Sequence, residues 1–394
     1  MIVSKIIMKY ILLISIFLLS LLNHTSFVYV PAVVMITWYA SIRTSFFKLS
    51  KGEILVSIIY SLFILLSALY FLIFIDDVSE ASEQSFTNNL FFSIVLFFIV
   101  FSISRVFKSE KGISDFTFAV KAVLIIHISA FFVQSAVVYA TDFYIDFIEP
   151  ITGEPSRYVN YITGAAMSSV LRYRATGLYV EPSTYASAIT CLIMAAYALN
   201  INKKIIYIAL LSLLLNFSTI GIILFVLVSI AIFSSKIRLV HVFLAVILIT
   251  ILLFIYNDLV SNFIDDFSYK LSKTSGTRFN LIEYIYLDAH GNIQLFGSGF
   301  FNIPPDLYTK ITKDRTISAL NDAGLMNFIV LKFGLISLLV VGYLFSKVKG
   351  GTLKLLFICV FISKISYVFP ILYIAIVPAL NKMRIDNAIM NRKQ

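Results

Sequence analysis

Residues 54–75 read ILVSIIYSLFILLSALYFLIFI, a run without a single charged side chain. A helix needs about 20 apolar residues to cross the roughly 30 Å hydrocarbon core of a bilayer. This run is long enough for one such crossing. It therefore decides the fold class, because it predicts a helical protein whose solvent is lipid.

Similar apolar runs recur along the chain. They lie near 6–22, 27–42, 90–107, 118–140, 183–200, 204–216, 219–234, 239–256, 323–346, 352–364 and 367–381. We interpret the first as an uncleaved helix rather than a signal peptide, since further spans follow directly. The polar joint 216–219 between two short runs fits either a tight hairpin or a broken helix. The sequence thus predicts an all-α polytopic protein, with about 12 transmembrane helices in one integral membrane domain over 1–394.

The composition excludes other classes. Of the 394 residues, 60% are hydrophobic and only 13% are charged, which is about half the usual charged share. A soluble domain cannot bury that much apolar surface, and a disordered chain would be far more polar. The net charge of +10 would indicate nucleic acid in a soluble protein. Here we attribute it to the cytoplasmic loops and expect no nucleic-acid partner.

Basic residues occupy alternate loops, whereas the intervening loop 76–83 carries four acids and no basic residue. This alternation predicts that both termini are cytoplasmic and that the number of spans is even. The same charge rule, by which basic loops stay in the cytoplasm, favours dividing the run 352–381 into two helices at Lys364–Tyr367. It also places two long segments, 141–182 and 257–322, on the outer face. Long loops are usually functional, so we expect the site there.

The first long segment ends in a cluster of polar and charged residues. Arg172, Arg174 and Gly177 lead into Glu181 and Pro182. Pro182 suits the first turn of the next helix, because a backbone N–H at that position has no hydrogen-bond partner within the helix and proline lacks this N–H. Arg174 and Glu181 would then lie at the lip of the membrane, within reach of a lipid headgroup. The alternative is that they pair with each other or extend to the interface.

The second long segment contains a predicted interfacial helix. Its apolar positions recur at helical spacing: Phe279, Ile282, Tyr286 and Ala289, beside Leu281 and Ile285. Arg278 would sit in its first turn, where the helix dipole disfavours a cation unless an anion is near. A turn at 297–299, Arg315 and the pair Asn321-Asp322 follow before the next span.

Several arginines thus lie on the predicted outer face, although Lys and Arg are normally concentrated in the cytoplasmic loops. Arginine suits bidentate contact with phosphate, so we infer a phosphate-bearing lipid as substrate. Cys191 and Cys359 fall inside apolar runs, and the four histidines are scattered without ligand spacing. The sequence therefore predicts no cofactor and no metal site.

Three local patterns resemble the O-antigen ligase and polymerase superfamily, specifically a Wzy-type polymerase of bacterial surface polysaccharide. They are Arg174-x-x-Gly177 running into Glu181-Pro182-Ser183, then Thr277-Arg278 with Gly297-x-Gly299 downstream, and Asp322-x-Gly324 followed by Lys332-Phe333-Gly334. Topology carries as much weight as these short motifs. The ligase branch commonly has a His-Asn pair before the late span. This chain has Leu320-Asn321-Asp322 there, which favours polymerase over ligase.

The resemblance implies a GT-C-like membrane fold in the bacterial inner membrane and a glycosyltransferase that joins undecaprenyl-diphosphate-linked repeat units at the periplasmic face. Its partners would be those lipid-linked glycans, membrane lipid and a chain-length regulator protein. The catalytic residues would be Arg174, Arg278, Glu181 and Asp322, with Arg172, Arg315, Gly177, Gly299 and Asn321 binding substrate. The rival hypotheses are a ligase and a non-enzymatic flippase or transporter. A transporter would need ionisable residues facing a central cavity, and the spans carry few, chiefly Lys121, His127 and Lys332.

Overall fold

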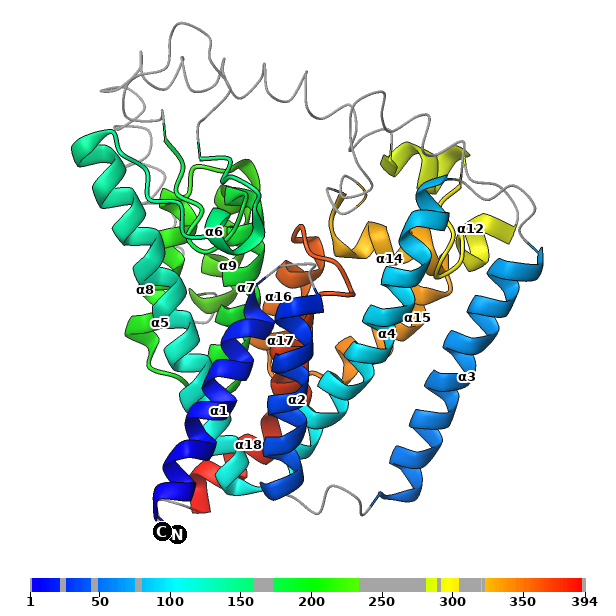
Figure 1. Cartoon of the computed structure of the whole chain (residues 1–394), viewed down its shortest axis with the longest axis horizontal. Coiled ribbons are helices and arrows are strands. Elements are labelled where there is room, and N and C mark those ends of the chain that lie inside the picture. Colours follow the sequence, from blue (N-terminus) through cyan, green and yellow to red (C-terminus); the bar gives the residue numbers. More distant parts are fainter. Residues whose placement is uncertain are drawn as a thin grey trace, which may run out of the picture.

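The computed structural model describes residues 2–21, 26–43, 49–74, 80–158, 173–233, 281–288, 292–304, 320 and 323–391. Within these ranges the regular elements are helices, and no strand is present (Figure 1). The prediction of an all-helical protein is confirmed.

The helices follow the predicted apolar runs. The first half contains α1 (Ile2–Ser20), α2 (Ser26–Arg43), α3 (Lys51–Phe74), α4 (Glu80–Val106), α5 (Glu110–Thr141) and α6 (Glu149–Thr152). The second half contains α7 (Pro182–Ala198), α8 (Lys203–Leu215), α9 (Thr219–Phe233), η2 (Tyr284–Asp288), α12 (Asn292–Phe296), α14 (Leu325–Phe333), α15 (Ser337–Lys347), α16 (Gly351–Ile362), α17 (Pro370–Leu380) and α18 (Lys382–Asn391). The predicted run 239–256 lies outside the described residues.

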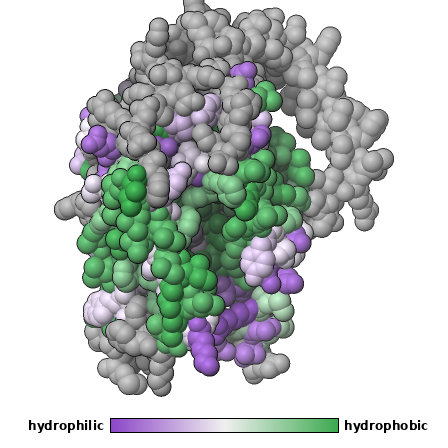
Figure 2. Space-filling model, turned by 90° about the vertical axis from the view of Figure 1, so that its right-hand side faces the viewer, coloured by the Kyte–Doolittle hydropathy of each residue, from purple (hydrophilic) through white to green (hydrophobic). Residues whose placement is uncertain are grey.

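Three stretches, Lys51–Ile73, Phe86–Val106 and Glu110–Thr141, are long and apolar enough to cross a membrane. Figure 2 shows hydrophobic residues gathered across the middle of one face, with polar residues both above and below them and a hollow between two hydrophobic ridges. Length, composition and surface therefore suit the chain to a membrane. The number of spans stays a prediction, because most of the other apolar helices are shorter.

Helix α7 is buried along most of its length and packs against α5, α8, α9, α16 and α17. Small residues such as Ala186, Ala188, Cys191 and Ala195 are fully buried along it. Small side chains let neighbouring backbones approach closely, which is the main source of helix association in lipid. The core of the protein is thus built around α7, and the residues at its N-terminal end are held from several sides.

The joint 216–219 forms a hairpin rather than a broken helix, since α8 and α9 pack against each other. The backbone turns at Phe217, which has a φ of 50°. The Ser218 hydroxyl accepts a hydrogen bond of 3.0 Å from the Gly221 N–H and so caps the start of α9. The two alternatives that the sequence left open are resolved in favour of the hairpin.

Charged loops that were predicted to share one side do meet at one end of the bundle. Glu53 contacts Lys108 at 2.6 Å, and the Arg384 guanidinium donates to the Lys108 carbonyl at 2.7 Å. Asn200 donates to Asp386 at 2.8 Å. Both chain termini lie at this same end in Figure 1. Which compartment this end faces remains a prediction.

The last two runs behave differently from each other. The run 352–381 is divided as predicted, into α16 and α17 with the linker 363–369 between them. The run 323–346, expected as one span, is instead interrupted at Gly334, where φ is 66°. Glycine adopts this left-handed conformation without the penalty that a Cβ imposes, so the helix ends there and restarts as α15.

Candidate functional site

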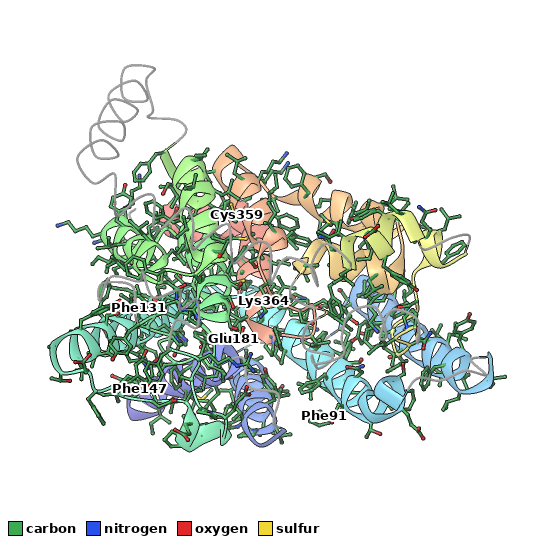
Figure 3. All side chains as sticks on the ribbon, turned by 90° about the horizontal axis from the view of Figure 1, so that it is seen from above. Phe91, Phe131, Phe147, Glu181, Cys359 and Lys364 are labelled. Carbon is green, nitrogen blue, oxygen red and sulfur yellow. The ribbon has the colours of Figure 1, made fainter. Side chains whose placement is uncertain are left out.

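The N-terminal end of α7 carries a compact ionic cluster. Glu181 precedes α7, and its carboxylate accepts from Lys364 Nζ at 2.7 Å and from the Arg157 guanidinium. The Ser183 hydroxyl donates to the same carboxylate at 3.0 Å. Glu181 and Lys364 lie close together at the centre of the molecule when it is viewed from above (Figure 3). The cluster joins the first long segment, the head of the core helix and the α16–α17 linker.

The electrostatics of this cluster are those of a fixed anion between two cations. Burial alone would raise the pKa of the Glu181 carboxyl, but Lys364 first and then Arg157 lower it to about 2. Glu181 is therefore ionised throughout the physiological range. A general base works best with a pKa near the ambient pH. As arranged here, Glu181 is better suited to holding the two cations than to accepting a proton.

The backbone just before Glu181 is held by a buried side chain of α5. The Gly177 N–H donates to Gln134 Oε1 at 2.7 Å, and Gln134 Nε2 donates back to the Gly177 carbonyl at 2.9 Å. Gly177 has a φ of 61°, and a Cβ there would lie 2.8 Å from the ring of Tyr185. Only glycine fits this position without strain. Gly177 thus has a clear conformational role in placing the segment.

The neighbouring residues are held in the same way from two further elements. Asn216, in the α8–α9 turn, donates to the Ala175 carbonyl at 3.1 Å. The Thr176 N–H donates to the Tyr144 hydroxyl, whose oxygen lies 2.7 Å from Thr176 Oγ1. Buried polar groups are costly unless they are paired. Three consecutive residues, 175–177, therefore each have a buried polar partner, and the segment has little freedom to move.

A deeper contact involves His127 of α5, which is fully buried. Its Nε2 lies 2.8 Å from Ser20 Oγ, and its ring stacks on Tyr179 at 5.2 Å between centroids. Tyr179 also donates to the Ser20 carbonyl at 3.0 Å. His127 thus joins α1 and α5 to the segment before α7. Its contacts are those of a packing residue rather than of one that lines a transport path.

The structure brings together part of the predicted site. Arg174, Gly177 and Glu181 all lie in the segment before α7, and the Arg174 N–H donates to the Tyr158 carbonyl at 2.8 Å. Pro182 is the first residue of α7, as predicted. Five predicted residues lie outside the described part of the chain: Arg172, Arg278, Arg315, Asn321 and Asp322.

Gly299, the remaining predicted residue, lies elsewhere. Its N–H donates to the Lys332 carbonyl at 3.0 Å, and the Ser298 N–H donates to the Leu331 carbonyl at 2.9 Å. These carbonyls are freed by the interruption at Gly334. The loop 297–304 therefore docks onto the C-terminal end of α14, where it supplies hydrogen bonds that a continuous helix would have made.

The predicted interfacial helix is seen in part. Residues 281–288 are helical, while 277–280 and 289 lie outside the described residues. The buried positions are Leu281, Tyr284 and Ile285, which pack against the α14 region. Tyr286 and Leu287 are exposed. The packed face is thus the one marked by Leu281 and Ile285, rather than the Ile282–Tyr286 stripe.

Sequence reasoning missed the importance of Lys364, Arg157 and Gln134. Lys364 had a signal, because it is a lone cation inside a long apolar run, and such residues are functional candidates by default. Arg157 is one of three arginines in its segment, and no local feature distinguishes it from the other two. Gln134 had no distinguishing signal, because its partner Gly177 is 43 positions away.

Within the described ranges, no group of three or more His, Cys, Asp or Glu side chains gathers as a metal site would require. Cys191 and Cys359 are free and buried. The chemistry that the cluster can offer is electrostatic, through two cations and the N-terminal end of α7, all of which favour an anion.

Comparisons of the chain with known protein families, with curated proteins and with solved structures find no match.

Proposed function

We propose that this protein is a polymerase of lipid-diphosphate-linked oligosaccharides, acting at the outer face of a bacterial inner membrane through a polytopic, GT-C-like bundle. The observation that carries the proposal is the cluster of Arg157, Lys364 and Glu181 at the N-terminal end of α7. In a chain that exposes many large apolar side chains, two cations gathered on one carboxylate suit an amphiphile with an anionic head.

The proposed reaction transfers a glycan from one lipid carrier to another. A hydroxyl oxygen of one repeat unit attacks the anomeric carbon of a chain on a second carrier, and the bond from that carbon to the diphosphate oxygen breaks. The lipid diphosphate leaves as an anion, and the hydroxyl proton passes to a base. Asp322, predicted from the sequence, is the candidate base in this scheme.

The cations stabilise the charge that grows on the leaving diphosphate, the electrostatic contribution that is often the largest in catalysis. Arg174, next to the cluster along the backbone, and Arg278, predicted in the second segment, would make the direct contacts. When the diphosphate binds, Arg157 and Lys364 pair with it instead of with Glu181. Glu181 then serves to keep both cations in place while the site is empty.

A transporter is less well supported. Lys121 lies on an exposed face of α5, and His127 is held by Ser20 and Tyr179. Lys332 is buried and donates to the Asn302 carbonyl at 2.6 Å. These three ionisable residues thus have separate surroundings and do not line a common path.

The test is the surface polysaccharide of a deletion strain that carries variants of the gene. Loss of a polymerase leaves single repeats on the lipid core, loss of a ligase leaves bare core with lipid-linked polymer, and loss of a flippase leaves neither. Arg174→Ala and Arg278→Ala should each give the single-repeat pattern at normal protein level. Lysine at either position should rescue little, because it lacks the forked geometry.

The matched control is Lys203→Ala, which removes an exposed cation at the opposite end of the bundle. It should leave polymer length unchanged. Normal polymer in both arginine variants, or a bare-core pattern in the deletion strain, would remove the polymerase proposal.

A further inference from the structure

The most loosely packed of the long helices is α3. Apolar side chains are exposed along its whole length, among them Leu55, Val56, Leu66 and Leu72. Its packing against α4 includes two stacked ring pairs, Tyr60 with Phe97 and Phe71 with Phe86, and the ionic contacts of Glu53. In a membrane, the exposed apolar side chains of α3 would contact the hydrocarbon chains of the lipid.

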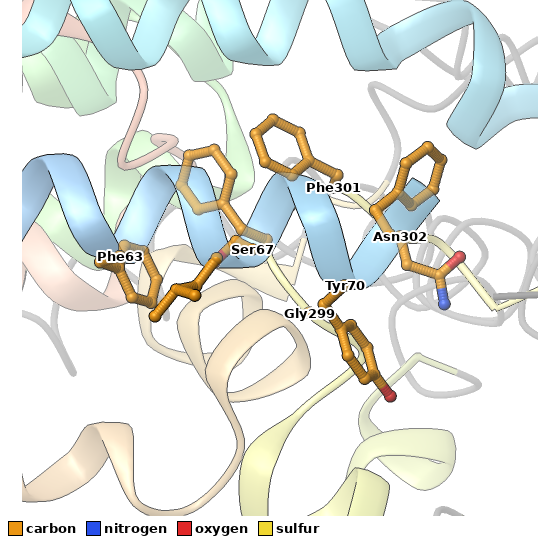
Figure 4. Close-up of a pocket in the computed structure, with 9 residues that line it drawn as sticks. Phe63, Ser67, Tyr70, Gly299, Phe301 and Asn302 are labelled. Atoms are coloured by element: carbon orange, nitrogen blue, oxygen red, sulfur yellow. The ribbon is translucent and has the colours of Figure 1, made fainter. Parts of the chain in front are cut away.

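Between α3 and the loop 297–304 lies a cavity of about 240 Å³. Its walls are mostly aromatic and aliphatic, and they are shown in Figure 4: Phe63, Leu66, Ser67, Tyr70 and Phe71 from α3, with Gly299, Phe300, Phe301 and Asn302 opposite. Phe63, Leu66 and Tyr70 are also exposed on the outside of the bundle. The cavity is therefore apolar and opens toward the lipid phase.

The cavity is joined to the ionic cluster by a short path of contacts. The ring of Phe300, in the cavity wall, lies 5.7 Å from that of Tyr367 in the α16–α17 linker. Lys364, three positions earlier in the same linker, contacts Glu181 at 2.7 Å. One linker thus has a cation at its start and, near its end, an aromatic ring that touches the cavity wall.

This arrangement matches an amphiphile that has an anionic head and a hydrocarbon chain. We propose that the cavity between α3 and residues 299–302 holds the diphosphate-proximal part of the isoprenoid chain of the lipid-linked substrate. The inference rests on the proposed function, which sets the diphosphate at the cluster. A free diphosphate sugar would leave the cavity empty, whereas a lipid diphosphate fills both places at once.

The expected binding gain is modest. Bilayer chains are as apolar as the cavity wall, so the gain comes from packing against fixed rings rather than from removing apolar surface from water. Filling the cavity with a side chain should therefore weaken binding of the lipid by about tenfold, which corresponds to roughly 1.4 kcal/mol.

The experiment uses the purified full chain in nanodiscs and an isoprenoid diphosphate that carries a photoreactive group close to the diphosphate. Adducts should form on the peptides that contain residues 63–71 or 299–302. An excess of unlabelled isoprenoid diphosphate should suppress them, and an excess of phosphatidylglycerol should not. Ser67→Trp, which fills the cavity, should reduce the adducts about tenfold, with the smaller Ser67→Leu intermediate.

The control is Ser61→Trp, the same substitution at an exposed position of α3 outside the cavity wall. It should leave the adducts unchanged. Equal labelling of the cavity by a photoreactive phosphatidylglycerol would show a general lipid contact and overturn the inference. If the isoprenoid diphosphate binds saturably but its adducts form elsewhere, only the cavity assignment is overturned. If it does not bind saturably at all, the proposed function is overturned as well.

Discussion

The Glu181–Lys364 pair allows a quantitative prediction. Lys364→Met removes the ammonium 2.7 Å from the carboxylate while keeping a side chain of similar length. The side chains of Lys364 and Glu181 are only 16% and 21% exposed, so solvent does little to compensate. Burial, which raises the pKa of Glu181, is unchanged in the variant, and the strongest influence that lowers the pKa is lost.

The magnitude follows from the pKa of Glu181, which is lowered from 4.5 to about 2 in the folded protein. That difference corresponds to roughly 3 kcal/mol of folding free energy. Because the folded-state pKa is depressed, this stability is present above about pH 4.5 and is lost as the pH falls toward 2. We expect Lys364→Met to remove most of it at pH 7, as expected when one partner of a buried pair is deleted.

The assay is a double-mutant cycle on the purified full chain in detergent, with unfolding measured at pH 7 and at pH 4. Lys364→Met should be destabilised by about 3 kcal/mol, and adding Glu181→Gln should restore most of the loss. Arg157→Ala is the matched control on the same carboxylate. The Arg157 side chain is 57% exposed, so its loss should cost less than about 1 kcal/mol. A coupling free energy near zero between Lys364 and Glu181 would refute the reasoning.

Two further predictions concern packing and topology. Gly334→Ala should displace α12 and the loop 297–304 that follows it, since a Cβ there would lie 2.1 Å from the carbonyl oxygen of Leu295 in α12, and protease cleavage within the loop should rise. Gly342→Ala, with nothing within 4 Å of its Cβ, is the control, and an unchanged cleavage pattern in both would contradict the docking. Cysteines that replace the exposed Glu154 and Lys203 should react with impermeant reagents from opposite sides of the membrane, and labelling of both from one side would contradict the predicted topology.

Local sequence patterns predicted the local structure well. Hydrophobic runs located the helices, and Pro182 marked the start of α7. Each of these features depends on residues that are close together in the chain. The interruption of the run 323–346 also had a local signal, Gly334, but glycine is tolerated in many membrane helices and does not by itself predict a break.

The site depended on contacts that no local pattern encodes. Lys364 and Glu181 are 183 positions apart, and Gln134 and Gly177 are 43 apart. A sequence shows that each residue is polar within an apolar chain, but not which partner satisfies it. Packing of the helices around α7 decides those pairs, and this explains why Arg174 and Glu181 were predicted as site residues while their surroundings were not.

The linker 363–369 connects the described parts of the two long segments, 141–182 and 257–322. The first segment reaches it through Glu181, which contacts Lys364, and the second reaches it through Phe300, which contacts Tyr367. The start of α14 is attached to the same linker, because the Leu325 N–H donates to the Ser363 carbonyl at 3.0 Å. The contact with the first segment is an ion pair whose side chains are only 16% and 21% exposed, and the contact with the second is between two aromatic rings. A displacement of this linker would therefore move Glu181 of the first segment and the cavity wall of the second together, which suits the proposed substrate, in which a charged head is joined to an apolar chain.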